Sequence, residues 1–257
     1  MAALLNHPLI ADRYFFPGGR PPASRLDVAV DGAVLACGLH RVDPDGFAVV
    51  HFHGNGEIVA DWQGVLDRAI NRLGWDVLLA EYRGYGGSTG TPLLGRMLDD
   101  VGAVIAAAGP PEKVVVMGRS VGSFFALEAV SRFPTIAGLI LESAIADPME
   151  RILLRVQPRE LGGSPGDVAA MEERLDQQRK IGGFKGRTLI LHTRFDGLID
   201  VSHALRLKRW ATGDATLRLF DAGDHNSILW ENTDEYLTAV ADFLASVRPR
   251  GDHKDER

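Results

Sequence analysis

One serine in the sequence has surroundings that are typical of a covalent nucleophile. Ser120 lies in the segment GRSVG at residues 118–122, which follows an apolar run, Val114–Met117, and precedes a stretch with helical spacing. A Gly-x-Ser-x-Gly segment between a strand and a helix makes a sharp turn that lifts the serine hydroxyl above the edge of a sheet. The helix that begins there favours negative charge beside the serine. We expect the neighbouring Arg119 to form a buried salt bridge rather than to bind an anionic acyl group.

A nucleophilic serine needs a base, and the base needs a group that orients it. His225 follows the apolar run Leu217–Phe220, so it should lie at the carboxyl end of a strand, where open α/β sheets carry their sites. Asp196 follows the preceding apolar run, Thr188–Leu191, which gives the chain order serine, aspartate, histidine. Glu142 also ends an apolar run and is the alternative acid, although we favour a structural hydrogen-bonding role for it.

Acyl transfer also requires donors for a negatively charged oxygen, and the loop after residues 47–52 is suited to provide one. It begins with the segment HGNG, whose glycines let the backbone approach a substrate. We expect the backbone N–H groups of Asn55 and Val121 to form this oxyanion hole. The alternative interpretation is a metal site at the histidines of residues 51–53. Because no further ligand cluster, HExxH or CxxC follows, we expect neither metal nor cofactor.

Short apolar runs alternate with helix-like segments along most of the chain, which predicts an α/β fold with a mostly parallel sheet covered on both faces. The first two runs, Leu26–Val30 and Val34–Leu39, flank Asp31-Gly32 and predict a hairpin. The later runs, each expected to be a strand, are Phe47–Phe52, Val77–Ala80, Val114–Met117, Leu139–Leu141, Thr188–Leu191 and Leu217–Phe220. The helix-like segments are Val59–Leu73, Leu93–Ala108, Val121–Phe133, His203–Trp210 and Thr233–Val247.

One stretch, residues 147–186, breaks this alternation because it contains no strand-like run. It contains a helix-like piece at Arg151–Val156 and a charged helical segment around Val168–Lys180. We interpret it as a lid over the carboxyl edge of the sheet, and the alternative is a longer crossover without a lid function. Residues 1–247 then form a single domain, and residues 248–257 form a disordered polar tail.

Composition excludes several classes of protein. The 257 residues contain 28 Lys and Arg against 34 Asp and Glu, a net charge of −6, which argues against a nucleic-acid-binding protein. The single cysteine, Cys37, permits no internal disulfide, and no apolar run has the length of a membrane helix. The first residues lack the basic start of a secretory signal. These features favour a cytoplasmic protein.

Six segments in order resemble the serine α/β-hydrolase superfamily, over residues 26–247. More narrowly, the chain resembles the BEM46-like hydrolases and the α/β-hydrolase domain-containing proteins 13 and 17. The segments are HGNGE at 53–57, EYRGYGGSTG at 81–90, GRSVGS at 118–123, LESA at 141–144, DGLIDVSHA at 196–204 and GDHN at 223–226. The resemblance implies Ser120 as nucleophile, Asp196 as acid, His225 as base, and an oxyanion hole at Asn55 and Val121.

The resemblance and the residues together predict a serine hydrolase that cleaves a carboxylic ester or a thioester of a small-molecule substrate. Relatives include protein depalmitoylases, whose cysteine-rich N-terminus anchors them to membranes, whereas Cys37 is the only cysteine here. The alternatives are a peptidase or a perhydrolase with the same three residues, or a non-catalytic protein that binds a small ligand in the same fold. The sequence does not identify the substrate or the oligomeric state.

Overall fold

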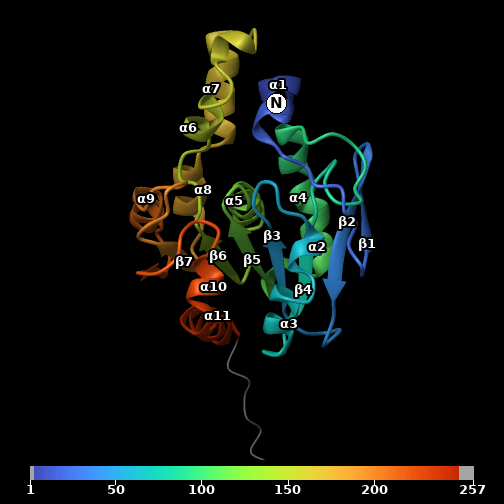
Figure 1. Cartoon of the computed structure of the whole chain (residues 1–257), viewed down its shortest axis with the longest axis vertical. Coiled ribbons are helices and arrows are strands. Elements are labelled where there is room, and N and C mark those ends of the chain that lie inside the picture. Colours follow the sequence, from blue (N-terminus) through green and yellow to red (C-terminus); the bar gives the residue numbers. More distant parts are fainter. Residues whose placement is uncertain (1–2, 249–257) are drawn as a thin grey trace, which may run out of the picture.

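In the computed structural model, which describes residues 3–248, eight strands form one sheet in the order β1-β2-β4-β3-β5-β6-β7-β8 (Figure 1). The hairpin of β1 and β2 and the pairing of β2 with β4 are antiparallel, and every other neighbouring pair is parallel. The strands are β1 (Leu26–Val30), β2 (Ala33–His40), β3 (Ala48–Phe52), β4 (Asp76–Ala80), β5 (Val114–Arg119), β6 (Gly138–Glu142), β7 (Arg187–Thr193) and β8 (Ala215–Phe220). The predicted strands and the hairpin are therefore confirmed.

Helices cover both faces of this sheet, as the alternation predicted. They are η1 (Ala3–Asn6), α1 (Pro8–Tyr14), α2 (Val59–Trp62), α3 (Leu66–Asn71), α4 (Leu94–Ala108), η2 (Pro111–Lys113), α5 (Gly122–Arg132), α6 (Pro148–Leu153), η3 (Pro158–Glu160), α7 (Pro165–Arg174), α8 (Gln177–Gly183), α9 (Ser202–Trp210), α10 (Ile228–Glu231) and α11 (Thr233–Val247). Residues of α1, α4, α5, α8 and α9 share one buried cluster, and residues of α2, α3, α10 and α11 share another.

Alternate residues of the central strands enter these two clusters. In β3, Val50 and Phe52 belong to the first cluster, and Val49 belongs to the second. Successive side chains of a strand point to opposite faces, so a sheet with helices on both faces needs apolar residues at consecutive positions. This requirement explains why continuous apolar runs, rather than alternating ones, marked the strands in the sequence.

Two helix predictions were wrong because a local hydrogen bond interrupts each helix. The predicted helix at Val59–Leu73 is broken at Gly64, which has a φ of +82°, and its N–H donates to the carboxylate of Asp67 at 2.7 Å. The predicted helix around Val168–Lys180 is two helices, α7 and α8. Asp176 lies between them and caps α8 by accepting a hydrogen bond from the Arg179 N–H at 2.9 Å.

Residues 147–186 form α6, η3, α7 and α8 and contribute no strand to the sheet. Figure 1 shows α6 and α7 beyond the sheet, at the same end of the molecule as α1. By contrast, α8 packs against α5, and Ile181 and Phe184 are part of the core. The segment therefore combines a projecting part with a part that belongs to the core.

Among the described residues, Arg248 is the last. Its guanidinium lies over the ring of Trp75, 4.8 Å from the ring centroid, so this first residue of the predicted tail packs against the domain. Residues 249–257 lie outside the described residues. None of the helices between residues 3 and 248 has both the length and the apolar character needed to cross a bilayer.

Candidate active site

The turn between β5 and α5 holds Ser120 in an unusual backbone conformation. Ser120 has a φ of +51°, in the left-handed region that non-glycine residues rarely adopt, and its N–H donates to the carbonyl of Glu142 at 2.9 Å. The turn packs too closely for larger residues, because a Cβ on Gly122 would lie 2.0 Å from the carbonyl oxygen of Phe52. A Cβ on Gly118 would lie 2.7 Å from the Gly122 carbonyl oxygen. The sequence argument for glycines on both sides of Ser120 therefore holds.

Three loops at the carboxyl ends of β5, β7 and β8 bring Ser120, Asp196 and His225 together. The Nε2 atom of His225 lies 3.0 Å from the Ser120 Oγ, and its Nδ1 lies 2.7 Å from an Asp196 carboxylate oxygen. All three side chains are buried. Because the Nδ1–H group donates a hydrogen bond to Asp196, the neutral ring presents a free electron pair at Nε2, which accepts a hydrogen bond from the serine hydroxyl.

The surroundings of Asp196 favour its charged form. Burial alone would raise the pKa of Asp196, but hydrogen bonds from His225 and from the Ile199 and Leu198 N–H groups lower the pKa below its ordinary value. The two backbone bonds reach the second carboxylate oxygen, at 2.7 and 2.9 Å. The aspartate is thus fixed in position and stays ionised beside the imidazole.

Sequence reasoning missed His192, a buried residue of β7 next to this carboxylate. Its Nε2 donates to the Ile199 carbonyl at 2.9 Å and lies 3.7 Å from Asp196. Burial lowers the pKa of His192 below its ordinary value, so a neutral ring supports the aspartate loop. The predicted strand Thr188–Leu191 ended one residue before His192, and no sequence signal connected this histidine with the aspartate loop four residues further on.

The two predicted oxyanion donors lie beside the serine. Asn55, Ser120 and Val121 line one cavity, and neither the Asn55 N–H nor the Val121 N–H has a protein acceptor within residues 3–248. The Asn55 side chain is held from two directions, since its Oδ1 accepts hydrogen bonds from the Phe16 N–H at 3.1 Å and from the Tyr85 hydroxyl at 3.0 Å. These contacts fix the side chain of Asn55, and N–H groups without a protein acceptor are suited to bind an anion.

The histidines of residues 51–53 have different surroundings. His53 contacts an acceptor with each ring nitrogen, the Gly54 carbonyl and the Glu81 carboxylate, both at 2.8 Å. Burial would lower the pKa of His53, but the charge and hydrogen bond of Glu81 raise it above its ordinary value. His51 packs against the ring of Trp62, 4.9 Å between centroids. Within residues 3–248, no group of three His, Cys, Asp or Glu side chains is placed to hold a metal ion.

Arg119 connects the loops that carry the candidate residues. Its guanidinium is buried and donates to the carboxylate of Glu142 at 3.0 Å, to the carboxylate of Glu57, and to the His225 carbonyl at 2.8 Å. Glu57 in turn accepts a hydrogen bond from the Gly54 N–H at 2.7 Å. The expected buried salt bridge is confirmed, and it ties the oxyanion loop to the histidine loop.

Glu142 has no contact with the His225 ring. Its two carboxylate oxygens accept hydrogen bonds from Arg119 and from the Tyr236 hydroxyl. Burial raises the pKa of Glu142 above its ordinary value, although Arg119 and Tyr236 oppose that shift. The structural role favoured for this carboxylate agrees with these contacts, and Asp196 is the carboxylate that meets the imidazole.

The cavity beside Ser120 has a volume of about 390 Å³. Its walls come from the serine turn, the loop after β7, the helix α6, and the N-terminal residues Tyr14 and Phe16. The position of the N-terminal segment was not predictable, because α1 is short and lacks a long apolar period. The contribution of α6 is what the lid interpretation expects.

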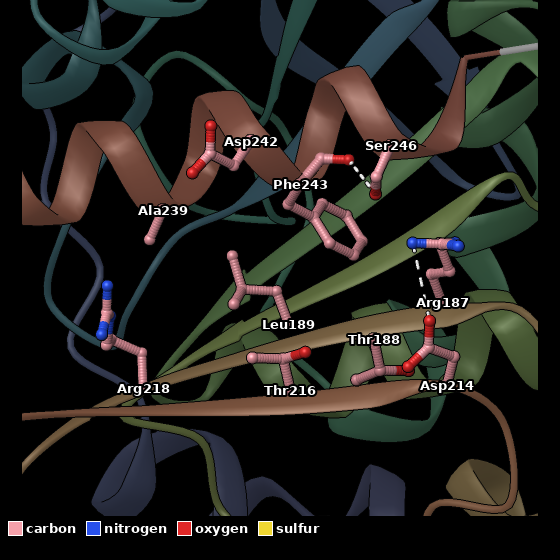
Figure 2. A pocket seen from close by; sticks show the side chains of 10 residues that line it. All are labelled: Arg187, Thr188, Leu189, Asp214, Thr216, Arg218, Ala239, Asp242, Phe243 and Ser246. Atoms are coloured by element: carbon pink, nitrogen blue, oxygen red, sulfur yellow. Dashed lines mark hydrogen bonds and ion pairs between the residues drawn. The ribbon is translucent and has the colours of Figure 1, made fainter. Parts of the chain in front are cut away.

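A second cavity, of about 370 Å³, lies far along the strands from the candidate site (Figure 2). Figure 2 shows Leu189 of β7 facing Phe243 of α11, and Arg187 paired to Asp214 at 3.5 Å. Thr188 and Leu189 belong to the start of β7, whereas Asp196 follows its end. This cavity therefore contacts none of the residues predicted to do chemistry.

Comparisons with known proteins agree with this architecture. Residues 48–167 match the family described as alpha/beta hydrolase fold. The Escherichia coli (strain K12) protein YfhR is 26% identical over 209 residues, which cover 77% of this chain and 70% of YfhR. Human alpha/beta hydrolase domain-containing protein 17B is 22% identical over 220 residues, covering 83% and 72%.

The solved structures include a similar fold in Est1E from Butyrivibrio proteoclasticus, determined with bound ferulic acid. It aligns with a TM-score of 0.70 at 16% identity and covers 86% of this chain and 98% of that chain. The order of the strands, the serine turn and the similarity to YfhR and to protein 17B lead to one conclusion. The chain has the α/β-hydrolase fold and is similar to these hydrolase-fold proteins over most of its length.

Proposed function

We propose that this protein is a serine hydrolase that cleaves a carboxylic ester or a thioester through an acyl-enzyme intermediate. The observation that carries the proposal is the chain of contacts from Ser120 through His225 to Asp196, at 3.0 and 2.7 Å, on a turn that strains the serine backbone. Strained backbone of this kind persists where a fold needs it for function. A small-molecule acyl substrate fits a cavity of about 390 Å³.

In this mechanism His225 Nε2 accepts the proton of Ser120 as its Oγ attacks the substrate carbonyl carbon. The carbonyl oxygen becomes an oxyanion, and the N–H groups of Asn55 and Val121 donate to it. Each such donor stabilises the transition state by about 3 kcal/mol in related chemistry. Asp196 stabilises the imidazolium that forms, without taking its proton.

The tetrahedral intermediate then collapses, and the bond from the carbonyl carbon to the leaving group breaks. His225 returns its proton to the leaving alcohol or thiol, which departs and leaves the acyl group on Ser120. A water molecule attacks this acyl-enzyme and gives a proton to His225; the bond from the carbonyl carbon to the Ser120 Oγ then breaks, His225 returns the proton to that oxygen, and the acid product leaves. A cytoplasmic location stays a prediction from the sequence.

The first test is covalent labelling by a fluorophosphonate, which reacts with an activated serine. We expect the wild-type protein to be labelled at one site, and Ser120→Ala to lose both this label and kcat by several orders of magnitude on p-nitrophenyl esters. Ser143→Ala is a matched control, since Ser143 is buried and also has a positive φ. Stoichiometric labelling of the Ser120→Ala variant would refute the assignment, and no labelling of wild type would favour the non-catalytic alternative.

A further inference from the structure

Two arginines of the segment 147–186 line the same cavity as Ser120. They are Arg151, which lies in α6 and is half-buried, and Arg155, which lies in the turn after α6 and is exposed. The Arg155 N–H donates to the Ile152 carbonyl at 2.9 Å, so the chain keeps a helical course through this turn. Residues four apart on such a course lie on the same side. Two positive charges therefore face one cavity from one element.

Neither guanidinium has a carboxylate partner within the part of the chain that the structure describes. The nearby acids are engaged elsewhere, because Glu150 pairs with Arg206 at 3.4 Å and Glu160 pairs with Arg13 at 2.8 Å. No Asp or Glu is among the residues that line this cavity. The positive charge at the cavity is thus not neutralised by the protein.

The positive charges of Arg151 and Arg155 influence a neighbouring side chain of the cavity wall, Tyr14. Tyr14 also lines the cavity, and burial raises the pKa of its hydroxyl above the ordinary value. The positive charges of Arg151 and Arg155 oppose this shift, so both are close enough to stabilise a negative charge at the tyrosine oxygen. An anionic group of a ligand at this place would experience the same field.

We propose that Arg151 and Arg155 select an ester or thioester whose acyl part or leaving group carries a carboxylate or a phosphate. This inference rests on the proposed hydrolase function and adds a class of substrate to it. Guanidinium groups bind both anions with paired hydrogen bonds. Because no carboxylate of the described residues neutralises these two arginines, the cavity favours an anionic ligand. The apolar lining at Ile145, Leu154 and Leu198 suits a short aliphatic link between that anion and the ester carbonyl.

The experiment compares anionic esters with neutral counterparts in which a methyl group masks the carboxylate. On the acyl side, mono-p-nitrophenyl glutarate is compared with its methyl ester. On the leaving-group side, the butyrate ester of 4-hydroxybenzoate is compared with that of methyl 4-hydroxybenzoate. We expect wild-type kcat/KM to favour the anionic member of one pair by about tenfold, which corresponds to a modest, partly solvated charge pair. The arm that shows the preference identifies the part of the substrate that carries the anion.

The variants assign that preference to the two arginines. The anionic-to-neutral ratio should fall to near one in Arg151→Gln/Arg155→Gln and should largely return in Arg151→Lys/Arg155→Lys, which keeps the charges. Arg159→Gln is the matched control, because Arg159 is an exposed arginine of the same segment that does not line the cavity. Its ratio should equal that of wild type. A wild-type ratio of one in both arms, or a ratio that the Gln variant preserves, overturns the inference.

A binding measurement separates this inference from the proposed function. Ser120→Ala should bind monomethyl glutarate more tightly than dimethyl glutarate in calorimetry, and Arg151→Gln/Arg155→Gln on that background should remove the difference. If wild type hydrolyses neutral esters but shows no charge preference and no such binding, only the inference fails. If the binding difference is present but no ester is hydrolysed and no serine is labelled, the proposed function fails while the anion site stands.

Discussion

Two buried carboxylates, Asp196 and Glu142, lie near the candidate nucleophile in surroundings that suit different tasks. Asp196 meets the imidazole of His225 and is held charged by two backbone N–H groups. Glu142 is bound to Arg119 and the Tyr236 hydroxyl, both of which belong to the packed interior. The first arrangement suits the orientation of a base, as the proposed mechanism requires, and the second neutralises a buried cation.

Asp196→Asn should therefore impair catalysis more than Glu142→Gln does. Loss of the charge at the orienting acid leaves the histidine in the wrong tautomer, which costs about 10⁴ in kcat in serine proteases. Glu142→Gln should instead destabilise the fold by about 3 kcal/mol, because Arg119 loses a buried partner. Steady-state ester hydrolysis and urea unfolding measure the two effects. The opposite ranking, with folded Glu142→Gln inactive and Asp196→Asn near full activity, would move the acid to β6.

His51 should make the protein less stable in mild acid. Burial, together with the nearby charges of His53 and Arg119, lowers the pKa of His51 well below its ordinary value. As pH falls below about 6.5, the unfolded chain takes up a proton at this position and the folded chain does not, so stability falls by up to about 1.4 kcal/mol per pH unit. We expect His51→Phe to reduce this slope in urea unfolding between pH 6.5 and 5, while the part that comes from buried His192, whose pKa is also lowered, remains.

His53 has the opposite sign and does not mask the effect. Its pKa is raised by Glu81, so the stability from this pair is present below about pH 6.5 and is lost as pH rises through the folded pKa. The His51→Phe variant keeps this contribution and should gain stability relative to wild type only on the acid side. Parallel curves of stability against pH for the two proteins would show that His51 is not the group responsible.

The candidate residues were easier to predict than the groups that hold them. Ser120, Asp196 and His225 each follow an apolar run, and the parallel course of those strands brings their carboxyl ends to one edge. By contrast, the Arg119 contacts connect β5, β6 and two loops, and they depend on distances that a linear pattern does not contain. Tyr14 and Phe16 reach the cavity only because the N-terminal segment crosses the carboxyl edge of the sheet.

The ends of helices were also hard to predict from the sequence. The periodicity of residues 59–73 continues through Gly64, so it predicted one helix where the structure has two. A glycine in a helical pattern is often tolerated, but here Gln63 turns to an extended conformation after α2, and the Gly64 N–H donates to the Asp67 side chain instead of continuing the helix. The β5–α5 turn was predictable because its glycines have a steric reason that is local in sequence.

Gly122→Ala tests that steric reason. The added Cβ would lie 2.0 Å from the Phe52 carbonyl oxygen, which is backbone of β3 and has no freedom to move aside. We expect destabilisation by more than about 3 kcal/mol, or failure to fold, in urea unfolding followed by circular dichroism. Gly166→Ala is the matched control, because its Cβ meets only the Ser164 hydroxyl, at 3.6 Å in the exposed first turn of α7. That change should be neutral or stabilising by up to about 1 kcal/mol.

The segment 147–186 contributes both to the wall of the cavity and to the buried core of the molecule. Its helix α6 lines the cavity, whereas Ile181 and Phe184 are buried in the cluster that includes α5. Lys180 is also buried, and its ammonium lies 3.1 Å from the carboxylate of Glu128 in α5. Replacing the whole segment by a flexible linker would leave Glu128 buried without this partner and expose one face of α5. A size limit imposed by the segment must therefore be tested by a point change.

Leu154→Trp is that point change. Leu154 lines the cavity and is 65% exposed, so a larger ring should fill space beside Ser120 without disturbing the core. If α6 limits the acyl group, kcat/KM for p-nitrophenyl octanoate should fall about tenfold or more relative to the acetate, because the longer chain loses its apolar contacts. Leu205→Trp is the matched control, since Leu205 is 51% exposed on α9 and does not line the cavity. If Leu154→Trp shows the same dependence of rate on chain length as wild type and Leu205→Trp, the segment does not limit the acyl group. Acyl selection would then depend on the walls formed by Tyr14, Phe16 and Leu198.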